Sequence, residues 1–268
     1  MRKKSFFNLF PGFRTVRFRI KKSKLFLNFL FLSLFALSAC SSYYQTNYQS
    51  QQLRVLSDAQ PDTSLTRIIS PYKSALDDEM NEVVGDFAND MSRGRPESTL
   101  GNFICDMLLK QGEKVYGDTI DFSVYNYGGI RLDQMNAGPV TRGKIFELLP
   151  FENFAVVVNL DASATRQLIQ KVINENGWPV GGIQITVKNN LPEKILIHNM
   201  PFDSTRNYKI IMNDYMANGG DNLFFLAGQP AEFLGVTIRD LALQYIQNEY
   251  LAGRKIYSSV DGRIKYAE

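Results

Sequence analysis

The sequence predicts a single mixed-sheet α+β domain over residues 63–268, with helices flanking the sheet. Four segments repeat apolar residues at the three- and four-residue spacing of helices, and five shorter segments are rich in β-branched or aromatic residues. The two kinds follow one another without regular strand–helix alternation, which favours an α+β domain over a doubly wound sheet. A stretch of about 200 residues fits one domain.

Apolar spacing places four long helices along the chain. The first is expected from about Ser64 to Met91, and Pro71 either starts it or bends it. The second covers Ser98–Lys110, the third lies near Ser163–Glu175 and the fourth near Thr237–Tyr250. Between them lie five strand-like segments bounded by Gly, Asn, Asp or Pro: Ile120–Tyr125, Ala155–Leu160, Ile183–Lys188, Lys194–His198 and Tyr208–Asn213.

Residues 1–39 have the layout of a secretory signal. Residues 1–24 hold nine Lys or Arg and no acid, and 13 mostly apolar residues, Leu25–Leu37, follow them. A spanning helix needs about 20 apolar residues, so this run is too short to anchor the chain by itself. The next residues, Ser38-Ala39-Cys40, resemble the end of a bacterial lipobox, in which Cys40 becomes the lipidated first residue. The alternative is an ordinary signal peptide in which Cys40 is incidental.

We therefore expect an exported protein that is lipid-anchored in the bacterial cell envelope. Residues 40–62 would hold the lipidated Cys40 and a tether, because they are rich in Ser, Gln, Asn and Tyr and poor in aliphatic residues. Without residues 1–39 the chain keeps 21 basic and 27 acidic residues, a net charge of −6. The basic character of the whole chain thus belongs to the signal, and we expect no nucleic-acid partner.

Four segments place Gly, Asn, Asp and Arg at the ends of strands or helices, where function is often found. Asn126-Tyr127-Gly128-Gly129-Ile130-Arg131 follows a strand, and its glycines permit a turn with positive φ. Leu148–Asn153 (LLPFEN) follows a helix that begins near Thr141 and is stopped by Pro150. Asp214–Asp221 (DYMANGGD) follows another strand, and Arg93–Asn102 (RGRPESTLGN) leads into the second helix.

Together these segments resemble, in the same order, the motifs of the 5′-nucleotidase C-terminal domain family. NYGGIR resembles N-x-G-G-[IV]-R, LLPFEN resembles LPF-x-N, DYMANGGD resembles aromatic-x-A-x-G-G-D, and RPESTLGN resembles E-x-x-x-G-N. The closing Val260–Lys265 resembles the final strand of that family. The resemblance covers about residues 64–268, and it implies the fold of that domain and a site for a nucleoside or nucleoside 5′-monophosphate.

The resemblance also implies a role for each site residue. Phe151 and Tyr215 would clamp the base between their rings, although the family usually has Phe where Tyr215 stands. Asn126 and Asn153 would hydrogen-bond the edge of the base, and Asp221 would accept from the ribose hydroxyls. Arg131 and either Arg93 or Arg95 would face the 5′-phosphate.

Each residue also has a structural explanation that the sequence leaves open. Phe151 and Tyr215 could be core residues, and Asn126, Asn153 and Asp221 could stabilise turns through their own backbone. Asp221 could instead cap a short helix over 222–226, and Arg131 could be a surface ion-pair residue. These explanations account for single residues but not for the joint order of the motifs.

The metal chemistry of two-domain 5′-nucleotidases is missing from this sequence. In that family a metallophosphatase domain precedes the C-terminal domain and needs several His and Asp ligands. The chain has one histidine, His198, and after lipidation its remaining cysteine, Cys105, lies on an apolar helical face and is expected in the core. We expect no catalytic residue, metal or cofactor in this chain, and divalent metal ions on a partner metallophosphatase.

Three functions remain open. The chain could be the nucleotide-recognition subunit of a split 5′-nucleotidase, with a separate metallophosphatase chain supplying the metals. It could be a stand-alone surface lipoprotein that binds nucleosides or nucleotides. It could also be a scaffold with a vestigial pocket, although retained Arg131 and Asp221 count against that.

Overall fold

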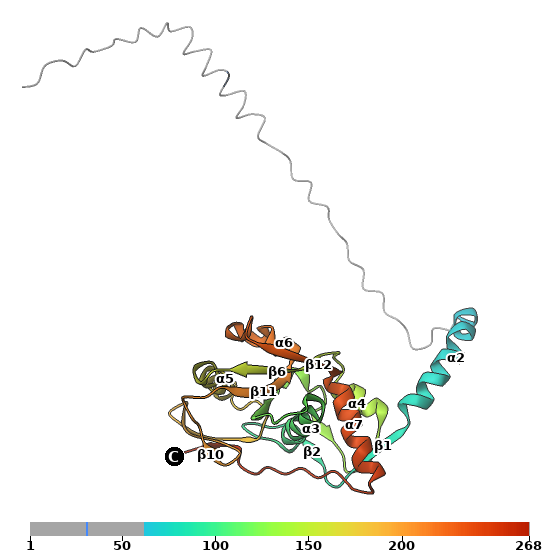
Figure 1. The fold of residues 1–268 in the computed structure, drawn as a ribbon. Helices are drawn as coiled ribbons and strands as arrows, with labels where there is room; N and C mark the ends of the chain where they lie inside the picture. The colour runs from blue at the N-terminus through green and yellow to red at the C-terminus, as the bar shows by residue number, and fades with distance from the viewer. Residues whose placement is uncertain (1–30, 32–61, 268) are drawn as a thin grey trace, which may run out of the picture. The chain divides into compact units, whose positions relative to one another are not determined.

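The computed structural model describes Phe31 and residues 62–267. The predicted signal apart from Phe31, the predicted lipidation site Cys40 and the tether up to residue 61 lie outside the described residues. Helix α2 (Thr63–Met80) begins at Asp62, whose carboxylate accepts from the backbone N–H groups of Ser64 and Leu65. It continues through Pro71, and Figure 1 shows it projecting from the body of the domain.

The centre of the domain is a five-stranded mixed sheet (Figure 1). In spatial order its strands are β12 (Ala231–Thr237), β6 (Phe154–Leu160), β11 (Tyr208–Asn213), β3 (Phe122–Val124) and β7 (Val180–Gly181). Strand β11 runs parallel to β3 on one side and antiparallel to β6 on the other. Strands β12 and β7 pair antiparallel at the two edges.

Both faces of this sheet are covered, which explains the continuous apolar run in β6. Ala155 and Val157 point into one hydrophobic cluster, whereas Val156 and Val158 point into another, as the two-residue period of a strand requires. Three helices supply the first cluster: α3 (Thr99–Tyr116), α4 (Arg142–Leu148) and α7 (Ile238–Leu251). Helix α5 (Ala162–Asn174) and a second sheet supply the other cluster.

The second sheet and two small ribbons complete the fold. The four-stranded sheet has the order β10 (Met200–Pro201), β9 (Leu191–Ile197), β8 (Ile183–Lys188) and β13 (Ile264–Tyr266), with β13 parallel to β8. The ribbons pair β1 (Val83–Phe87) with β5 (Gly138–Thr141), and β2 (Met91–Ser92) with β4 (Gln134–Met135). Short helices are α6 (Asp214–Ala217) and the 3-10 turns Tyr127–Gly129, Gly220–Asn222 and Phe224–Leu226.

The mixed-sheet α+β prediction is confirmed, but the first predicted helix is wrong beyond Met80. Val83 and Phe87 lie on β1 and Met91 lies on β2. A spacing of four residues returns to the same face of a helix and also to the same face of a strand, so it did not separate the two. The second predicted helix was too short, because α3 continues to Tyr116 and ends at Gly117, whose φ is 77°.

The remaining predicted elements lie close to the observed ones, except that β9 starts three residues earlier than expected and ends before His198, which lies in a turn with φ 48°. The two edge strands of the central sheet, β7 and β12, were not predicted. Cys105 is buried in the first cluster as predicted. Burial raises the pKa of its thiol, so it stays protonated and is a core residue.

Candidate functional site

The predicted site segments meet at one edge of the central sheet. The parallel strands β3 and β11 both end there, and the antiparallel strand β6 begins there. Asn126 therefore follows β3, Tyr215 follows β11, and Asn153 directly precedes β6. The register pairs Asn213, the last residue of β11, with Ala155 near the start of β6.

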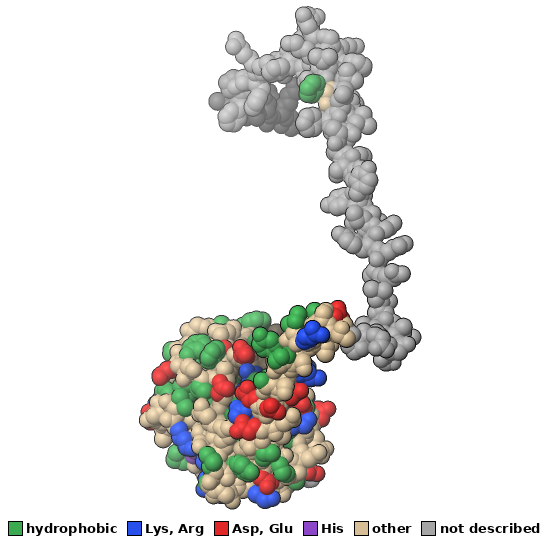
Figure 2. Space-filling view, turned by 90° about the vertical axis from the view of Figure 1, so that its right-hand side faces the viewer, with side chains coloured by type: hydrophobic (Ala, Val, Ile, Leu, Met, Phe, Trp, Pro, Cys, Tyr) green, Lys and Arg blue, Asp and Glu red, His purple; other side chains and the backbone are tan. Residues whose placement is uncertain are grey.

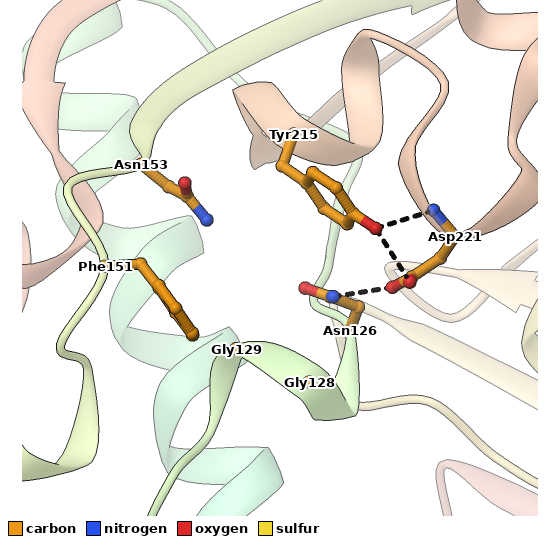
Figure 3. Close-up of a pocket in the computed structure, with 7 residues that line it drawn as sticks. All are labelled: Asn126, Gly128, Gly129, Phe151, Asn153, Tyr215 and Asp221. Carbon is orange, nitrogen blue, oxygen red and sulfur yellow. Dashed lines mark hydrogen bonds between the residues drawn. The ribbon is translucent and has the colours of Figure 1, made fainter. Parts of the chain in front are cut away.

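A cavity of about 240 Å³ lies at this edge (Figure 3). Five of the eight predicted binding residues line it, together with the two glycines of the NYGGIR turn. The lining consists of Asn126, Gly128, Gly129, Phe151, Asn153, Tyr215 and Asp221. The structure therefore brings together residues that lie up to 95 positions apart in the sequence.

Phe151 and Tyr215 are not core residues. Their exposed fractions are 46% and 47%, and Figure 3 shows the two rings on different sides of the cavity. Large aromatic rings are normally buried, so two half-exposed rings facing one cavity leave apolar surface for a flat ligand to cover. The alternative that these rings fill the core is wrong.

A closed hydrogen-bond network holds the Tyr215 side of the cavity. The Tyr215 hydroxyl donates to Asp221 Oδ1 at 3.1 Å, and the backbone N–H of Asp221 donates back to that hydroxyl at 3.2 Å. The Asn126 amide donates to Asp221 Oδ2 at 2.6 Å. Because both carboxylate oxygens have protein partners, the carboxylate is held in one orientation.

The backbone of this side is tightly constrained. Asp221 has φ 53° and Gly219 has φ 95°, in the left-handed region. A Cβ on Gly220 would lie 2.5 Å from the Tyr215 ring, so only glycine lets that ring lie over the chain. Asp221 makes no cap to the following turn, whose first residues lack a side-chain hydrogen bond, so the capping alternative is wrong.

The Phe151 side is held through main-chain groups. Arg239, buried on α7 with 8% exposed, donates to the carbonyl of Pro150 at 3.1 Å and to that of Leu149 at 3.5 Å. Its guanidinium also reaches Glu152 at 3.4 Å, and the N–H of Ile238 donates to the carbonyl of Asn153 at 2.9 Å. These contacts fix the loop without involving the Phe151 side chain.

None of the three predicted arginines lines the cavity. The Arg131 guanidinium is 6.0 Å from the centroid of the Phe151 ring, and within residues 62–267 no carboxylate pairs with it. Arg93 donates to the carbonyl of Ile130 and pairs with Asp133 at 3.3 Å. Arg95 lies 4.2 Å from the Tyr127 ring centroid. Within residues 62–267, Arg131 and Arg95 thus have an aromatic neighbour but no hydrogen-bond or ion-pair partner for their guanidinium groups, whereas Arg93 has both.

The two glycines of NYGGIR serve a different purpose from the one predicted. Neither has positive φ; together with Tyr127 they form a 3-10 turn. A Cβ on Gly129 would lie 2.6 Å from the buried Tyr125 ring, so close packing requires the glycine. Burial raises the pKa of Tyr125, against the opposing effect of a hydrogen bond from Asn213, and its hydroxyl stays protonated beneath the site.

The RPESTLGN segment contacts the residues before the C-terminal strand, and its acidic residue, Glu97, does not line the cavity. The Glu97 carboxylate accepts from the N–H groups of Asp261, Gly262 and Arg263, each at 2.9 Å. Asn102 donates to Glu97 at 2.7 Å and to the carbonyl of Ser259 at 2.8 Å. These contacts place β13 beside β8.

Sequence reasoning missed two residues that build the site. Asn213 is fully buried and donates to Asn126 at 2.9 Å, and Arg239 holds the Phe151 loop. A polar residue at the end of the apolar strand YKIIMN was the available signal for Asn213. Nothing in the sequence marked Arg239, because its partners are main-chain carbonyls about 90 residues earlier.

The described residues do not fit a metal centre. Within residues 62–267, His, Cys, Asp and Glu side chains nowhere gather in a group of three that could hold an ion. The helices of this part of the chain also include none with the length and apolarity to cross a bilayer.

Fold and site thus define a mixed α+β domain with an aromatic-walled cavity at the edge of its central sheet. A family model described as the 5′-nucleotidase, C-terminal domain, matches residues 82–228, more than half of the chain. The chain belongs to this family. The cavity residues from Asn126 to Asp221 all fall within the matched range.

Two relatives are a nucleotide phosphoesterase and a 5′-nucleotidase. The trifunctional nucleotide phosphoesterase protein YfkN of Bacillus subtilis is 28% identical over 219 residues, and the 5′-nucleotidase of Mus musculus is 24% identical over 239 residues. The alignments cover 74% and 77% of this chain but 15% and 40% of those proteins. The chain therefore spans less than half the length of these relatives.

Solved structures share the fold. The 5′-nucleotidase precursor from Thermus thermophilus superposes with a TM-score of 0.63 at 24% identity, over 78% of this chain and 44% of that chain. The NAD nucleotidase of Haemophilus influenzae has a TM-score of 0.60 at 17% identity, over 76% and 41% of the two chains.

Proposed function

We propose that this domain is the nucleotide-recognition subunit of a split 5′-nucleotidase. It would bind the base and ribose of a nucleoside or nucleoside 5′-monophosphate, and a metallophosphatase on another chain would break the phosphate ester. One observation carries the binding role: two half-exposed rings on different sides of a cavity of about 240 Å³. Stacking of a base on an aromatic side chain contributes about 1–3 kcal/mol and tolerates any base.

The polar groups of the cavity suit the rest of a nucleoside. Asp221, with its carboxylate held in place, would accept from ribose hydroxyls, and Asn126 and Asn153 would hydrogen-bond the base. Arg131, assisted by Arg93 or Arg95, would face a 5′-phosphate at the mouth of the cavity.

Residues 62–267 contain no group of three His, Cys, Asp or Glu side chains that could hold a metal ion, which supports a second chain for the hydrolysis of the phosphate ester. Two divalent ions about 3.5–4 Å apart are the usual means of clamping the attacking and leaving oxygens of a phosphate ester. The divalent metals would therefore belong to the partner. This chain would contribute by binding the part of the substrate remote from the phosphate, which orients the reacting group.

Helix α2 offers a surface for that partner. Its apolar side chains form one stripe that no described residue buries, with Tyr72 77% exposed, and Figure 2 shows such side chains on the projecting helix. The stripe consists of Leu65, Ile68, Ile69, Tyr72 and Leu76. Helix α2 ends two residues before the region that matches the family model. In two-domain members the metallophosphatase domain also comes before this region in the sequence.

The test measures binding and hydrolysis separately. Calorimetric titration of the mature chain with nucleosides and nucleoside 5′-monophosphates should show binding that Phe151→Ala weakens. The chain alone should not hydrolyse nucleotides with Mn²⁺, Zn²⁺, Co²⁺ or Mg²⁺. Addition of an exported metallophosphatase encoded beside it should produce hydrolysis that Phe151→Ala removes. Robust metal-dependent hydrolysis by the chain alone would contradict the split arrangement.

The docking role of α2 has its own variant. Ile69→Glu should abolish the gain in hydrolysis from adding the partner and leave nucleoside binding unchanged, because no residue of α2 lines the cavity. Ser74→Glu, on the polar side of the same helix, is the matched control. If both variants behave alike, α2 is not the docking surface.

A stand-alone nucleoside- or nucleotide-binding lipoprotein is the second candidate, since the lack of any group of three possible metal ligands within residues 62–267 is compatible with it as well. Binding without any partner-dependent hydrolysis would select it. For either candidate we propose that the protein is exported and anchored by a lipid on Cys40, which the signal-like residues 1–39 support. Cys40→Ala should then move the protein from the membrane fraction to the soluble fraction.

A further inference from the structure

Helix α2 carries a regular apolar seam that the described part of the chain leaves uncovered. Four large apolar side chains follow one another at spacings of four, three and four residues, and each is more than half exposed: Leu65, Ile69, Tyr72 and Leu76. Alternating steps of three and four residues average about 3.5, the repeat with which two helices wrap around each other and interlock their apolar side chains. The seam therefore fits another helix that presents the same repeat.

A second copy of α2 is such a helix. In an antiparallel pair centred between Ile69 and Tyr72, Ile69 of one copy packs against Tyr72 of the other. At the same time Leu65 of one copy packs against Leu76 of the other. Each of these contacts occurs twice, as the two-fold symmetry of a homodimer requires. All four seam residues are then covered by seam residues.

The charges of α2 favour the antiparallel orientation. Asp77, Asp78 and Glu79 lie in its last turn, which holds no basic residue, and acidic groups there oppose the helix macrodipole. A parallel pair would bring these carboxylates of both copies together at one end. An antiparallel pair separates the two acidic groups by the 18 residues of the helix, about 27 Å. It also places each acidic end beside the N-terminal end of the other helix, where the dipole is positive.

The attachment of α2 to the domain favours the same orientation. Its C-terminal end lies against α4, because a Cβ on Gly143 would be 3.0 Å from the carbonyl oxygen of Met80. The other end of the helix projects from the body of the domain (Figure 1). Antiparallel pairing therefore puts the two domain bodies at opposite ends of the helix pair, whereas parallel pairing would put both at the same end.

We propose that α2 is a self-association surface, through which two copies of this chain pair as an antiparallel two-helix coiled coil. The seam spans about two heptads, so the pairing of free chains is weak. The pairing does not depend on the proposed function. Its residues belong to the stripe proposed to dock a metallophosphatase, so a second copy and that partner exclude each other.

Disulfide trapping tests the pairing and its orientation. The mature chain carries Cys40→Ser, which leaves the buried Cys105 as its remaining cysteine. Chains with Leu65→Cys are mixed with chains with Leu76→Cys, oxidised mildly and separated on a non-reducing gel. The mixture should form a covalent dimer, because the two positions are in contact.

Each cysteine variant by itself should stay monomeric. In the antiparallel pair, the two copies of Leu65→Cys lie about 16 Å apart along the helices, and so do the two copies of Leu76→Cys. A disulfide spans a Cα separation of only about 4.4–6.8 Å.

Charge variants show whether the seam drives the pairing. Ile69→Glu in both chains of the mixture should prevent the covalent dimer, because it places a carboxylate in the apolar seam. Ser74→Glu, on the opposite side of the same helix, is the matched control and should leave cross-linking unchanged. Thermal unfolding should not change in any variant, since the domain buries none of the residues of α2.

Three results would overturn the proposal. A covalent dimer from the Leu65→Cys chain alone would mean parallel pairing, and no covalent dimer from the mixture would mean no pairing. Cross-linking of the mixture that survives Ile69→Glu would mean that the seam does not hold the copies together. None of these results bears on nucleoside binding, so the proposed function is tested separately.

Discussion

The two sides of the cavity present similar rings but hold them by different means. On the Phe151 side, Arg239 and the N–H of Ile238 bind main-chain carbonyls of the loop. On the Tyr215 side, the ring itself takes part, because its hydroxyl bonds to Asp221, which bonds in turn to Asn126. The first ring depends on the backbone, and the second is one member of a side-chain network.

This difference separates two kinds of recognition. A ring on a fixed loop contributes contact area that tolerates any flat base. In the proposed function, a ring hydrogen-bonded to the carboxylate beside it would couple base stacking to the group that would contact ribose. Residues joined in one network are expected to be non-additive on mutation, whereas residues on the two sides should act independently.

The largest expected loss of affinity comes from removing the coupled ring. Phe151→Ala should weaken nucleoside binding by about 1–3 kcal/mol, the value of one stacked base. Tyr215→Ala should lose a similar amount and about 0.5–1.5 kcal/mol more, because Asp221 loses a hydrogen-bond partner. Titration with adenosine and 2′-deoxyadenosine should show reduced ribose preference only for Tyr215→Ala. Equal preference in both variants would remove the contrast between the sides.

Removal of Arg239 tests the backbone attachment of the Phe151 side. Arg239→Met should lower the free energy of unfolding by about 1–3 kcal/mol, because the carbonyls of Leu149 and Pro150 lose their donor. Thermal and denaturant unfolding measure this, and nucleoside binding should weaken without a change in ribose preference. Arg239→Lys keeps the charge without the fork and should lie between wild type and Arg239→Met. A changed ribose preference would show that the two sides are coupled after all.

Arg131 extends the comparison to the phosphate. Arg131→Ala should weaken binding of a nucleoside 5′-monophosphate by about 1 kcal/mol at low salt and less at high salt, since the guanidinium is exposed. Binding of the nucleoside should hardly change. Arg166→Ala, at an exposed arginine on α5, is the control. Equal losses for nucleoside and monophosphate would reject a phosphate role for Arg131.

The smallest effect isolates a single hydroxyl. Tyr215→Phe keeps the stacking ring and removes both hydrogen bonds to Asp221. We expect a loss of about 0.5 kcal/mol for ribonucleosides and almost none for 2′-deoxynucleosides, as measured by parallel titrations. A uniform loss for both sugars would mean that the hydroxyl contacts the base and does not orient Asp221.

Much of the fold and of the cavity lining could be predicted because the signals are local. The spacing of apolar residues and the residues at the segment ends predicted helices α5 and α7 and strands β8 and β11 to within one residue. The region after Met80 could not be predicted in this way. Val83, Phe87 and Met91 repeat at four residues, a spacing that helices and strands share, and pairing with β5 and β4 selected the strands.

The sequence by itself identified five residues that line one cavity, since the order of the motifs pointed to Asn126, Phe151, Asn153, Tyr215 and Asp221. Only the tertiary structure decided how they are held. Asn213 and Arg239 act on partners 87 and about 90 residues away, and the parallel pairing of β11 with β3 brings the first of these contacts together. Hydrogen-bond direction depends on which donors and acceptors face each other after folding, so it cannot be predicted from the spacing of residues along the sequence.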